Sequence, residues 1–155
     1  MVWGASMTIE IRNTYPYDLR AMAESMTADS KDVANRLGYT PLKALWSSYR
    51  NSLYCKTGFI DGKIAAIWGI SGSMLAEVGK PWLVLSPEVK RNPLRVAFIY
   101  RKELNNMLKL FPVLEEWCPA DNEPSIRMLE LMGFRVDKNI TPIGGVEYRK
   151  AERRV

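Results

Sequence analysis

The chain has 155 residues, of which 47% are hydrophobic and 25% are charged, a composition typical of one globular domain with its own core. It contains no histidine, which excludes catalytic triads and acid–base catalysis that depend on imidazole. Its two cysteines, Cys55 and Cys118, lie far apart without CxxC spacing. Two thiolates without imidazole are too few for a zinc site.

The formal charge of +5 predicts a mild attraction to anions but does not indicate nucleic acid. The basic residues are scattered and are not interleaved with aromatic residues as a stacking surface requires. No signal peptide is recognised at the start, and the longest apolar runs, such as IAAIWGI, are too short to span a bilayer. We therefore expect a protein without a membrane span, in a reducing, cytoplasm-type setting.

The N-terminal third predicts one strand and three short helices. Residues 7–14 (MTIEIRNT) alternate apolar and polar residues, which is typical of a strand. A helix follows the turn at Pro16, over YPYDLRAMAESMTADS. A second helix, SKDVANRLGY, is predicted to have Ser30 as its N-cap and Gly38 at its end. A third, TPLKALWSSYRNSL, starts with the Thr40 cap followed by proline.

The middle of the chain predicts a hairpin, a buried strand and a long helix. Asp61–Gly62 between apolar runs predicts a hairpin with strands at about Leu53–Ile60 and Lys63–Ile70. KPWLVLS is a nearly all-apolar strand. The helix after it has Asn92 as a cap and proline in its first turn. Its apolar residues repeat at helical spacing: Leu94, Ala97, Tyr100, Leu104, Met107, Leu108 and Phe111.

The last third predicts a strand (VLEEWCPA), a capped helix ending at Gly133, and closing strands at FRVDK and GGVEYRKA. The order of elements favours an α/β (α+β) fold with a central mixed sheet of about six to seven strands and helices on both faces. Residues 1–155 form one predicted domain, with an N-terminal extension at 1–6 and a solvated basic tail at 151–155.

Two segments resemble a known fold. IEIRNTYPYDLRAM looks like the opening strand and helix of the GNAT N-acyltransferases, and WCPADNEPSIRMLELMGFRV is similar to their fifth strand and fourth helix, with Asn122 and Gly133–Phe134 at the matching positions. Within that fold, PWLVLS and EEWCPADNEPSIRMLELMGF look most like the GNAT-like internal virion proteins of short-tailed bacteriophages. This resemblance implies a location in the virion or the bacterial host cytoplasm, with other virion proteins or a second copy as partners.

The resemblance raises a question about the cofactor. GNAT enzymes bind the pyrophosphate of acyl-CoA where the fourth strand turns into a helix, and glycines let the backbone approach the anion. Here the turn is VKRNPLR, which has no glycine and whose Pro93 removes one N–H donor. Lys90, Arg91 and Arg95 are then either phosphate ligands by charge alone or a solvated helix start. Asn122 is a further candidate for cofactor contact by the match to the family motif.

Catalysis raises a second question. Many GNAT enzymes place a tyrosine four residues before the glycine of Gly–Phe as the acid, and Leu129 occupies that position here. Tyr100 and Tyr148 are possible substitutes, with Tyr100 on the apolar stripe of the long helix. Glu115 and Glu116 lie on the predicted strand, and alternation directs one of them inward, where burial would raise its pKa and suit it to act as a base. The other interpretation is a solvated carboxylate.

Three functions follow from these features. The first is a non-catalytic GNAT-fold virion or assembly component that acts through protein contacts and needs no cofactor, with Trp3 as a possible interface residue. The alternative is an acetyl-CoA-dependent N-acyltransferase with a degenerate pyrophosphate loop. The third, a nucleic-acid-binding module, is disfavoured by the scattered charge. As for nucleophilic catalysis, Cys118 is expected to be a small buried residue and not a nucleophile.

Overall fold

The computed structural model describes residues 7–36, 38–73 and 75–155. The predicted interface residue Trp3 and the N-terminal extension lie outside the described residues. The helices are α1 (Pro16–Ser25), α2 (Ala28–Arg36), α3 (Pro41–Asn51), the short 3₁₀-helix η1 (Pro87–Arg91), α4 (Pro93–Met107) and α5 (Glu123–Leu131). The strands are β1 (Ile9–Asn13), β2 (Tyr54–Ile60), β3 (Lys63–Ser73), β4 (Val78–Leu85), β5 (Val113–Pro119), β6 (Arg135–Val136), β7 (Thr141–Ile143) and β8 (Val146–Arg154).

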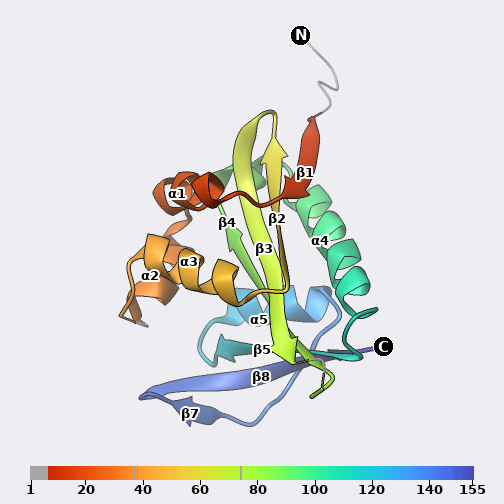
Figure 1. The fold of residues 1–155 in the computed structure, drawn as a ribbon. Helices are drawn as coiled ribbons and strands as arrows, with labels where there is room; N and C mark the ends of the chain where they lie inside the picture. Colours follow the sequence, from red (N-terminus) through yellow and green to blue (C-terminus); the bar gives the residue numbers. More distant parts are fainter. Residues whose placement is uncertain (1–6, 37, 74) are drawn as a thin grey trace. The chain divides into compact units, whose positions relative to one another are not determined.

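The described strands form a mixed sheet with the hydrogen-bonded order β1-β2-β3-β4-β5-β8-β6, and β7 pairs with β8. The pair β4–β5 is parallel, whereas β8 is antiparallel to each of its neighbours. The predicted α/β class with a mixed sheet is therefore confirmed (Figure 1). No described helix combines the length and apolar character needed to cross a bilayer.

The fold has two compact parts. The first consists of the described residues up to Gly69 together with Trp82–Pro93. Its core joins α1 and α3 to β3, and α1 and α3 lie beside each other in Figure 1. The buried members of this core are Leu19, Met22, Met26, Leu45 and Ile67. A single apolar stripe on each helix thus covers the apolar residues of one strand.

The β2–β3 hairpin is as the sequence predicted. Asp61 and Gly62 both have positive φ, 49° and 79°, as a two-residue type I′ turn requires. The Asp61 carboxylate also accepts a hydrogen bond from the Thr8 backbone N–H at 2.9 Å. The strand after this turn runs to Ser73 and exceeds the predicted end at Ile70.

The second part consists of Ile70–Pro81 and Leu94–Val155. In it β5 and β8 pair along their whole shared length, from Val113 opposite Arg154 to Pro119 opposite Tyr148. The 151–155 segment, predicted as a solvated tail, is mostly the last part of β8, and Ala151 is fully buried. The prediction was wrong because it was made from the charged side chains alone. The backbone of this segment pairs with two neighbouring strands, β5 and β6, which satisfy its N–H and C=O groups.

Two further predictions about helices were wrong in detail. Ser30 lies inside α2 and is not its N-cap. The N-cap is Thr27, whose hydroxyl accepts a hydrogen bond from the Ser30 N–H at 3.4 Å. The long helix ends at Met107, so Phe111 is buried beyond it, and Leu94 is 79% exposed in spite of its place on the predicted apolar stripe. Periodicity alone does not show where packing stops.

Candidate functional site

The turn from β4 into α4 is the predicted position for a pyrophosphate. It folds as the 3₁₀-helix η1, which the sequence did not predict. Ser86 precedes it and is 1% exposed; its hydroxyl donates a hydrogen bond to the Ile64 carbonyl at 2.7 Å and accepts one from the Glu88 N–H at 3.3 Å. The turn is therefore fixed to β3 through one buried hydroxyl.

Arg91, in this turn, pairs with two carboxylates. Its Nη2 lies 2.6 Å from Asp61 Oδ2, in the β2–β3 turn, and its Nη1 lies 3.8 Å from Glu88 Oε2. The pKa of Asp61 is lowered first by the hydrogen bond from the Thr8 N–H and then by that from Arg91. Arg91 thus has structural partners already.

Lys90 and Arg95 are both exposed. Lys90 makes no hydrogen bond or ion pair with the described residues. Asn92 separates η1 from α4, which begins at Pro93, as predicted. Its backbone N–H caps η1 by donating to the Val89 carbonyl at 3.3 Å. Positive charge is available where α4 begins, but no glycine brings the backbone close to an anion.

On β5 the two glutamates occupy different environments, because alternate strand residues point to opposite faces. The Glu115 carboxylate lies 3.3 Å from Lys150 Nζ and accepts a hydrogen bond from Trp117 Nε1 at 3.3 Å. Lys150 also lies 3.1 Å from Glu152. Glu115 is therefore part of an ion-pair network along the β5–β8 ladder.

Glu116 lies on the other face of β5, directly opposite the buried Ala151. The residue is half-buried, and burial raises its pKa to about 8. It makes no hydrogen bond or ion pair with the described residues. A carboxyl whose pKa is raised by burial and that has no cationic partner favours its neutral form at neutral pH.

Cys118 shares this face of β5, two residues further on, and is 3% exposed. Burial, and then the charge of Glu116, raise the pKa of its thiol. Reactivity requires the thiolate. Cys118 is thus a buried apolar residue, as the sequence predicted, and not an activated nucleophile.

Solved structures with a similar fold include acetyltransferases. The N-acetyltransferase paiA from Thermoplasma acidophilum, solved with coenzyme A, matches at a TM-score of 0.66 with 17% identity, over 96% of this chain and 100% of that one. A GNAT-family acetyltransferase from Streptococcus pneumoniae matches at 0.61 with 14% identity, over 96% and 99% of the two chains. The fold is that of the GNAT acetyltransferases.

A spermidine N-acetyltransferase chimera from Vibrio cholerae and hSSAT matches this GNAT fold at a TM-score of 0.68 with 11% identity, over 94% of this chain and 95% of that one. No protein-family model and no curated protein matches the sequence. The likeness to GNAT proteins is therefore a likeness of fold.

The GNAT fold locates the remaining candidates. Asn122 is the N-cap of α5, and its Oδ1 accepts a hydrogen bond from the Ser125 N–H at 3.2 Å. Leu129, at the tyrosine position, is half-buried on α5. Tyr100 is half-buried on α4, and Tyr148 is half-buried on β8. The assignment of a proton donor to either tyrosine stays a prediction.

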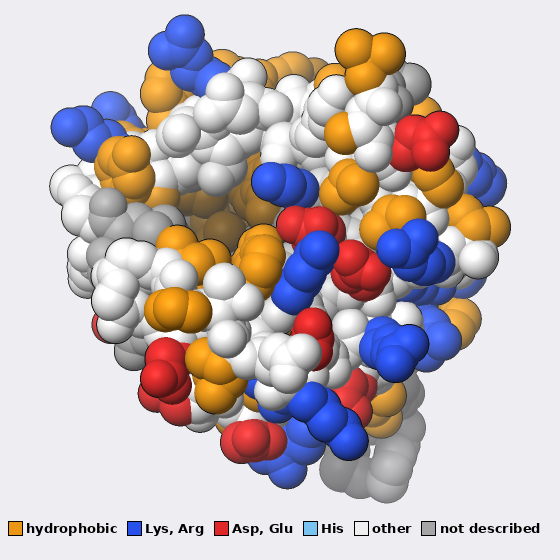
Figure 2. All heavy atoms as spheres, turned by 90° about the horizontal axis from the view of Figure 1, so that it is seen from below, with side chains coloured by type: hydrophobic (Ala, Val, Ile, Leu, Met, Phe, Trp, Pro, Cys, Tyr) orange, Lys and Arg blue, Asp and Glu red, His pale blue; other side chains and the backbone are white. Residues whose placement is uncertain are grey.

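Surface charge on this GNAT fold is mixed. On the face drawn in Figure 2, Lys and Arg side chains alternate with Asp and Glu side chains. Lys150 likewise lies between two carboxylates, those of Glu115 and Glu152. A nucleic-acid surface requires a continuous stripe of positive charge, which this face does not present.

Proposed function

We propose that the chain is an N-acyltransferase that transfers an acetyl group from acetyl-CoA to an amine. The observation that carries this proposal is the half-buried Glu116 of β5, which lies on the face opposite to the Glu115–Lys150 pair and whose pKa burial raises to about 8. A carboxylate with such a pKa is a stronger base than an ordinary one and titrates close to physiological pH. The acetyltransferase neighbours of the fold support the reaction class.

The residues at the start of α4 fit the anionic part of CoA by charge. The helix has 15 residues, so its N-terminal end attracts anions. Lys90 and Arg95 are exposed there and would hold the diphosphate, while Arg91 remains with Asp61. Because the turn has no glycine, we propose that side chains, and not backbone N–H groups, supply most of the binding.

When bound, acetyl-CoA supplies a thioester whose C–S bond breaks as the C–N bond to the acceptor amine forms. The role of Glu116 is to take the proton that the amine loses, through its carboxylate form. Only a minority of the carboxyl is ionised at pH 7 when its pKa is about 8, so the rate should rise with pH through that value. Cys118 stays protonated and takes no covalent part.

Titration calorimetry with acetyl-CoA tests the binding step. We expect a dissociation constant in the micromolar range, weakened roughly tenfold by Lys90→Gln combined with Arg95→Gln, as expected for the loss of charged contacts worth about 1.4 kcal/mol in total. Arg91→Gln is the matched control and should weaken binding less. No heat at millimolar acetyl-CoA would contradict the proposal.

Release of free CoA thiol in the presence of spermidine and of other amines tests turnover. Glu116→Gln should abolish the release while leaving the affinity for acetyl-CoA unchanged. Equal turnover by the wild type and Glu116→Gln would remove Glu116 as the base.

The non-catalytic virion role stays a prediction from the sequence, and the comparisons give it no support. It predicts no acetyl-CoA binding, together with association with other virion proteins or a second copy. Failure of the calorimetric test, followed by association in such a binding assay, would favour it over acetyl transfer.

A further inference from the structure

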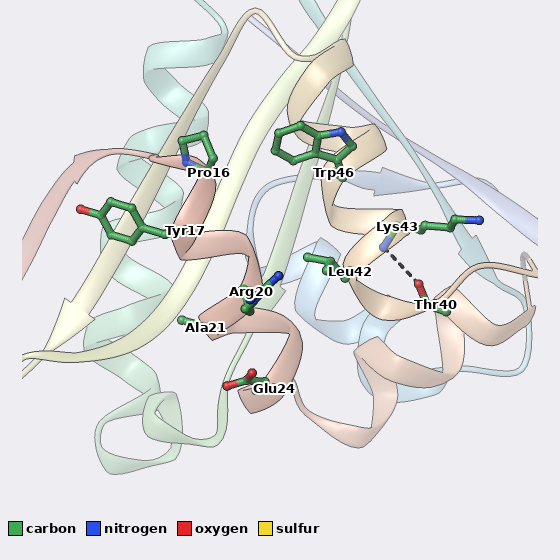
Figure 3. A pocket seen from close by; sticks show the side chains of 9 residues that line it. All are labelled: Pro16, Tyr17, Arg20, Ala21, Glu24, Thr40, Leu42, Lys43 and Trp46. Carbon is green, nitrogen blue, oxygen red and sulfur yellow. Dashed lines mark hydrogen bonds between the residues drawn. The ribbon is translucent and has the colours of Figure 1, made fainter.

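A groove of about 710 Å³ lies between α1 and α3, within the first compact part of the fold (Figure 3). This volume is within the range of small-molecule sites, about 300 to 1,000 Å³. The residues that line it are Pro16, Tyr17, Arg20, Ala21 and Glu24 of α1, with Thr40, Leu42, Lys43 and Trp46 of α3 and its cap. None of them is a candidate for acetyl transfer.

Three large apolar side chains of the lining are exposed to solvent. Tyr17 is 67% exposed and Trp46 is 42% exposed, and Leu42 adds a further exposed apolar side chain at 38%. Aromatic side chains bury large areas when a ligand covers them. Several exposed apolar side chains that line one concave groove indicate a binding surface.

The charged side chains of the lining are two cations, Arg20 and Lys43, and one carboxylate, Glu24. Arg20 lines the groove from α1 (Figure 3). Its guanidinium makes no hydrogen bond or ion pair with the described residues. Glu24 lies one turn further along α1 but forms no ion pair with it, and Lys43 on α3 adds a second positive charge. The groove thus carries a net positive charge, two cations against one carboxylate, beside apolar walls.

The chemistry of this lining selects a ligand. A planar guanidinium matches a carboxylate, which it can bind through two parallel hydrogen bonds. Apolar walls exclude water around such a pair and so strengthen it relative to an open surface. Trp46 and Leu42 would contact the apolar body of the same molecule.

We propose that the α1–α3 groove binds a small amphipathic carboxylate, with its aryl or alkyl body against Trp46 and Leu42 and its carboxylate on Arg20. The proposal does not depend on acetyl transfer, because its residues and its ligand are distinct from those of the proposed reaction. The groove would give the protein a second small-molecule site.

The test uses phenylbutyrate, with phenylbutanol and phenylbutylamine as probes of the same body and different charge. Each is titrated into the full chain while the tryptophan indole N–H resonances are followed by NMR; Trp46→Phe assigns the resonance of Trp46. We expect phenylbutyrate to shift the Trp46 resonance and to bind roughly tenfold more tightly than phenylbutanol, with phenylbutylamine weakest.

Arg20→Gln should remove the preference for the acid over the alcohol. Because Arg20 is exposed, this variant should fold, which an unchanged melting temperature verifies. Arg50→Gln is the matched control: Arg50 is an exposed arginine of α3 outside the lining, and its replacement should keep the preference. Equal affinity for the acid and the alcohol, no shift of Trp46, or a preference that survives Arg20→Gln would each overturn the proposal.

Discussion

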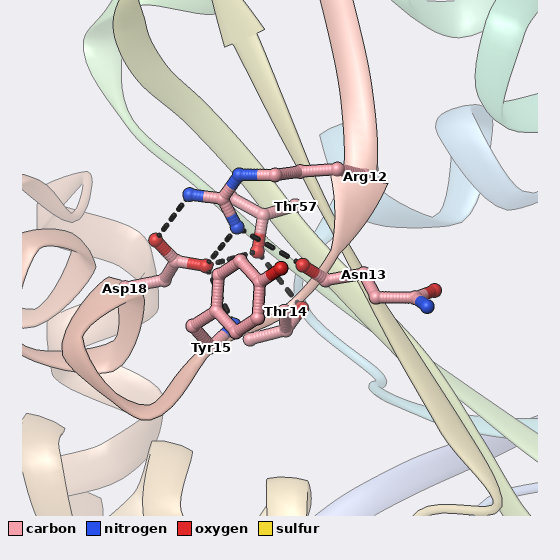
Figure 4. Close-up of polar contacts among 6 residues, drawn as sticks. All are labelled: Arg12, Asn13, Thr14, Tyr15, Asp18 and Thr57. Carbon is pink, nitrogen blue, oxygen red and sulfur yellow. Dashed lines mark hydrogen bonds and ion pairs between the residues drawn. The ribbon is translucent and has the colours of Figure 1, made fainter.

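The Arg12 guanidinium donates two hydrogen bonds to the Asp18 carboxylate, Nη1 to Oδ2 at 2.7 Å and Nη2 to Oδ1 at 2.9 Å (Figure 4). The pair joins β1 to the first turn of α1. Asp18 is 2% exposed and also accepts from the Tyr15 N–H at 2.8 Å and the Thr57 hydroxyl at 3.2 Å. Arg12 lies over the ring of Phe59 at 4.7 Å. A buried carboxylate with every oxygen satisfied fixes where the helix begins.

Replacing Asp18 by asparagine should be strongly destabilising. Burial alone would raise the pKa of this carboxyl, but the hydrogen bonds from Arg12 and Tyr15 lower it below its ordinary value. Ionised Asp18 therefore stabilises the fold above about pH 4, and this contribution is lost as pH falls through the lowered pKa. We expect Asp18→Asn to cost about 3 kcal/mol at pH 7.

Urea denaturation at pH 7 and at low pH measures this effect. Glu10→Gln, an exposed carboxylate on the same strand as Arg12, is the matched control and should change the free energy of unfolding by less than about 0.5 kcal/mol. A cost of Asp18→Asn that stays the same down to pH 2 would contradict the assigned ionisation.

Glu116→Gln should stabilise the protein at alkaline pH. Since the folded pKa of about 8 lies above the ordinary value of 4.5, the folded state binds the proton more tightly than the unfolded state. The contribution of protonated Glu116 to the free energy of unfolding is therefore fully present below about pH 4 and is lost as pH rises through 8. Glutamine cannot ionise, so we expect a gain above about 1 kcal/mol at pH 9 and none at pH 4.

Melting temperatures of the wild type and of Glu116→Gln, measured at pH 4 and at pH 9, test this expected gain in stability. Glu115→Gln is the control, because Glu115 is ion-paired with Lys150; it should bring no gain at pH 9. If Glu116→Gln is as stable as the wild type at both pH values, the pKa of Glu116 is not raised in solution.

Gly69→Ala should destabilise the first part of the fold. A Cβ at this position would lie 2.8 Å from the Cys55 sulfur and 2.9 Å from the Tyr54 carbonyl oxygen. Backbone cannot yield as a flexible side chain can, so we expect a cost of about 1 to 3 kcal/mol.

Chemical denaturation compares Gly69→Ala with Gly58→Ala. At Gly58 the added atom would meet only the ring of Trp68, at 3.1 Å, and the cost should be smaller. A larger cost at Gly58 than at Gly69 would show that the close backbone approach at Gly69 is relieved in solution.

Asn122→Ala separates a helix cap from a cofactor ligand. Because the Asn122 Oδ1 accepts from the Ser125 N–H, its loss should reduce the free energy of unfolding by about 1 kcal/mol. The affinity for acetyl-CoA, measured by calorimetry, should not change. Asn122→Asp keeps the cap and should restore stability; an alanine variant with normal stability and lost affinity would instead make Asn122 a ligand.

Features that depend on a few neighbouring residues could be predicted from the amino-acid sequence alone. The Asp61–Gly62 turn, the Thr40 cap of α3 and the start of α4 at Pro93 are all as predicted. Each depends on a local preference for a backbone conformation or on a local hydrogen bond, so the residue types alone are sufficient.

Which candidate residues are buried and which are ion-paired depends on the tertiary structure. Strand alternation predicted that one of Glu115 and Glu116 points inward but not which one, and the pairing of β5 with β8 decided it: Glu116 is opposite buried Ala151, while Glu115 is within reach of Lys150. Likewise, Arg91 is a basic turn residue in the sequence, and only the fold brings Asp61 to it from 30 positions away. Burial and charge pairing depend on segments that are distant along the chain, so a local pattern limits the candidates and packing chooses among them.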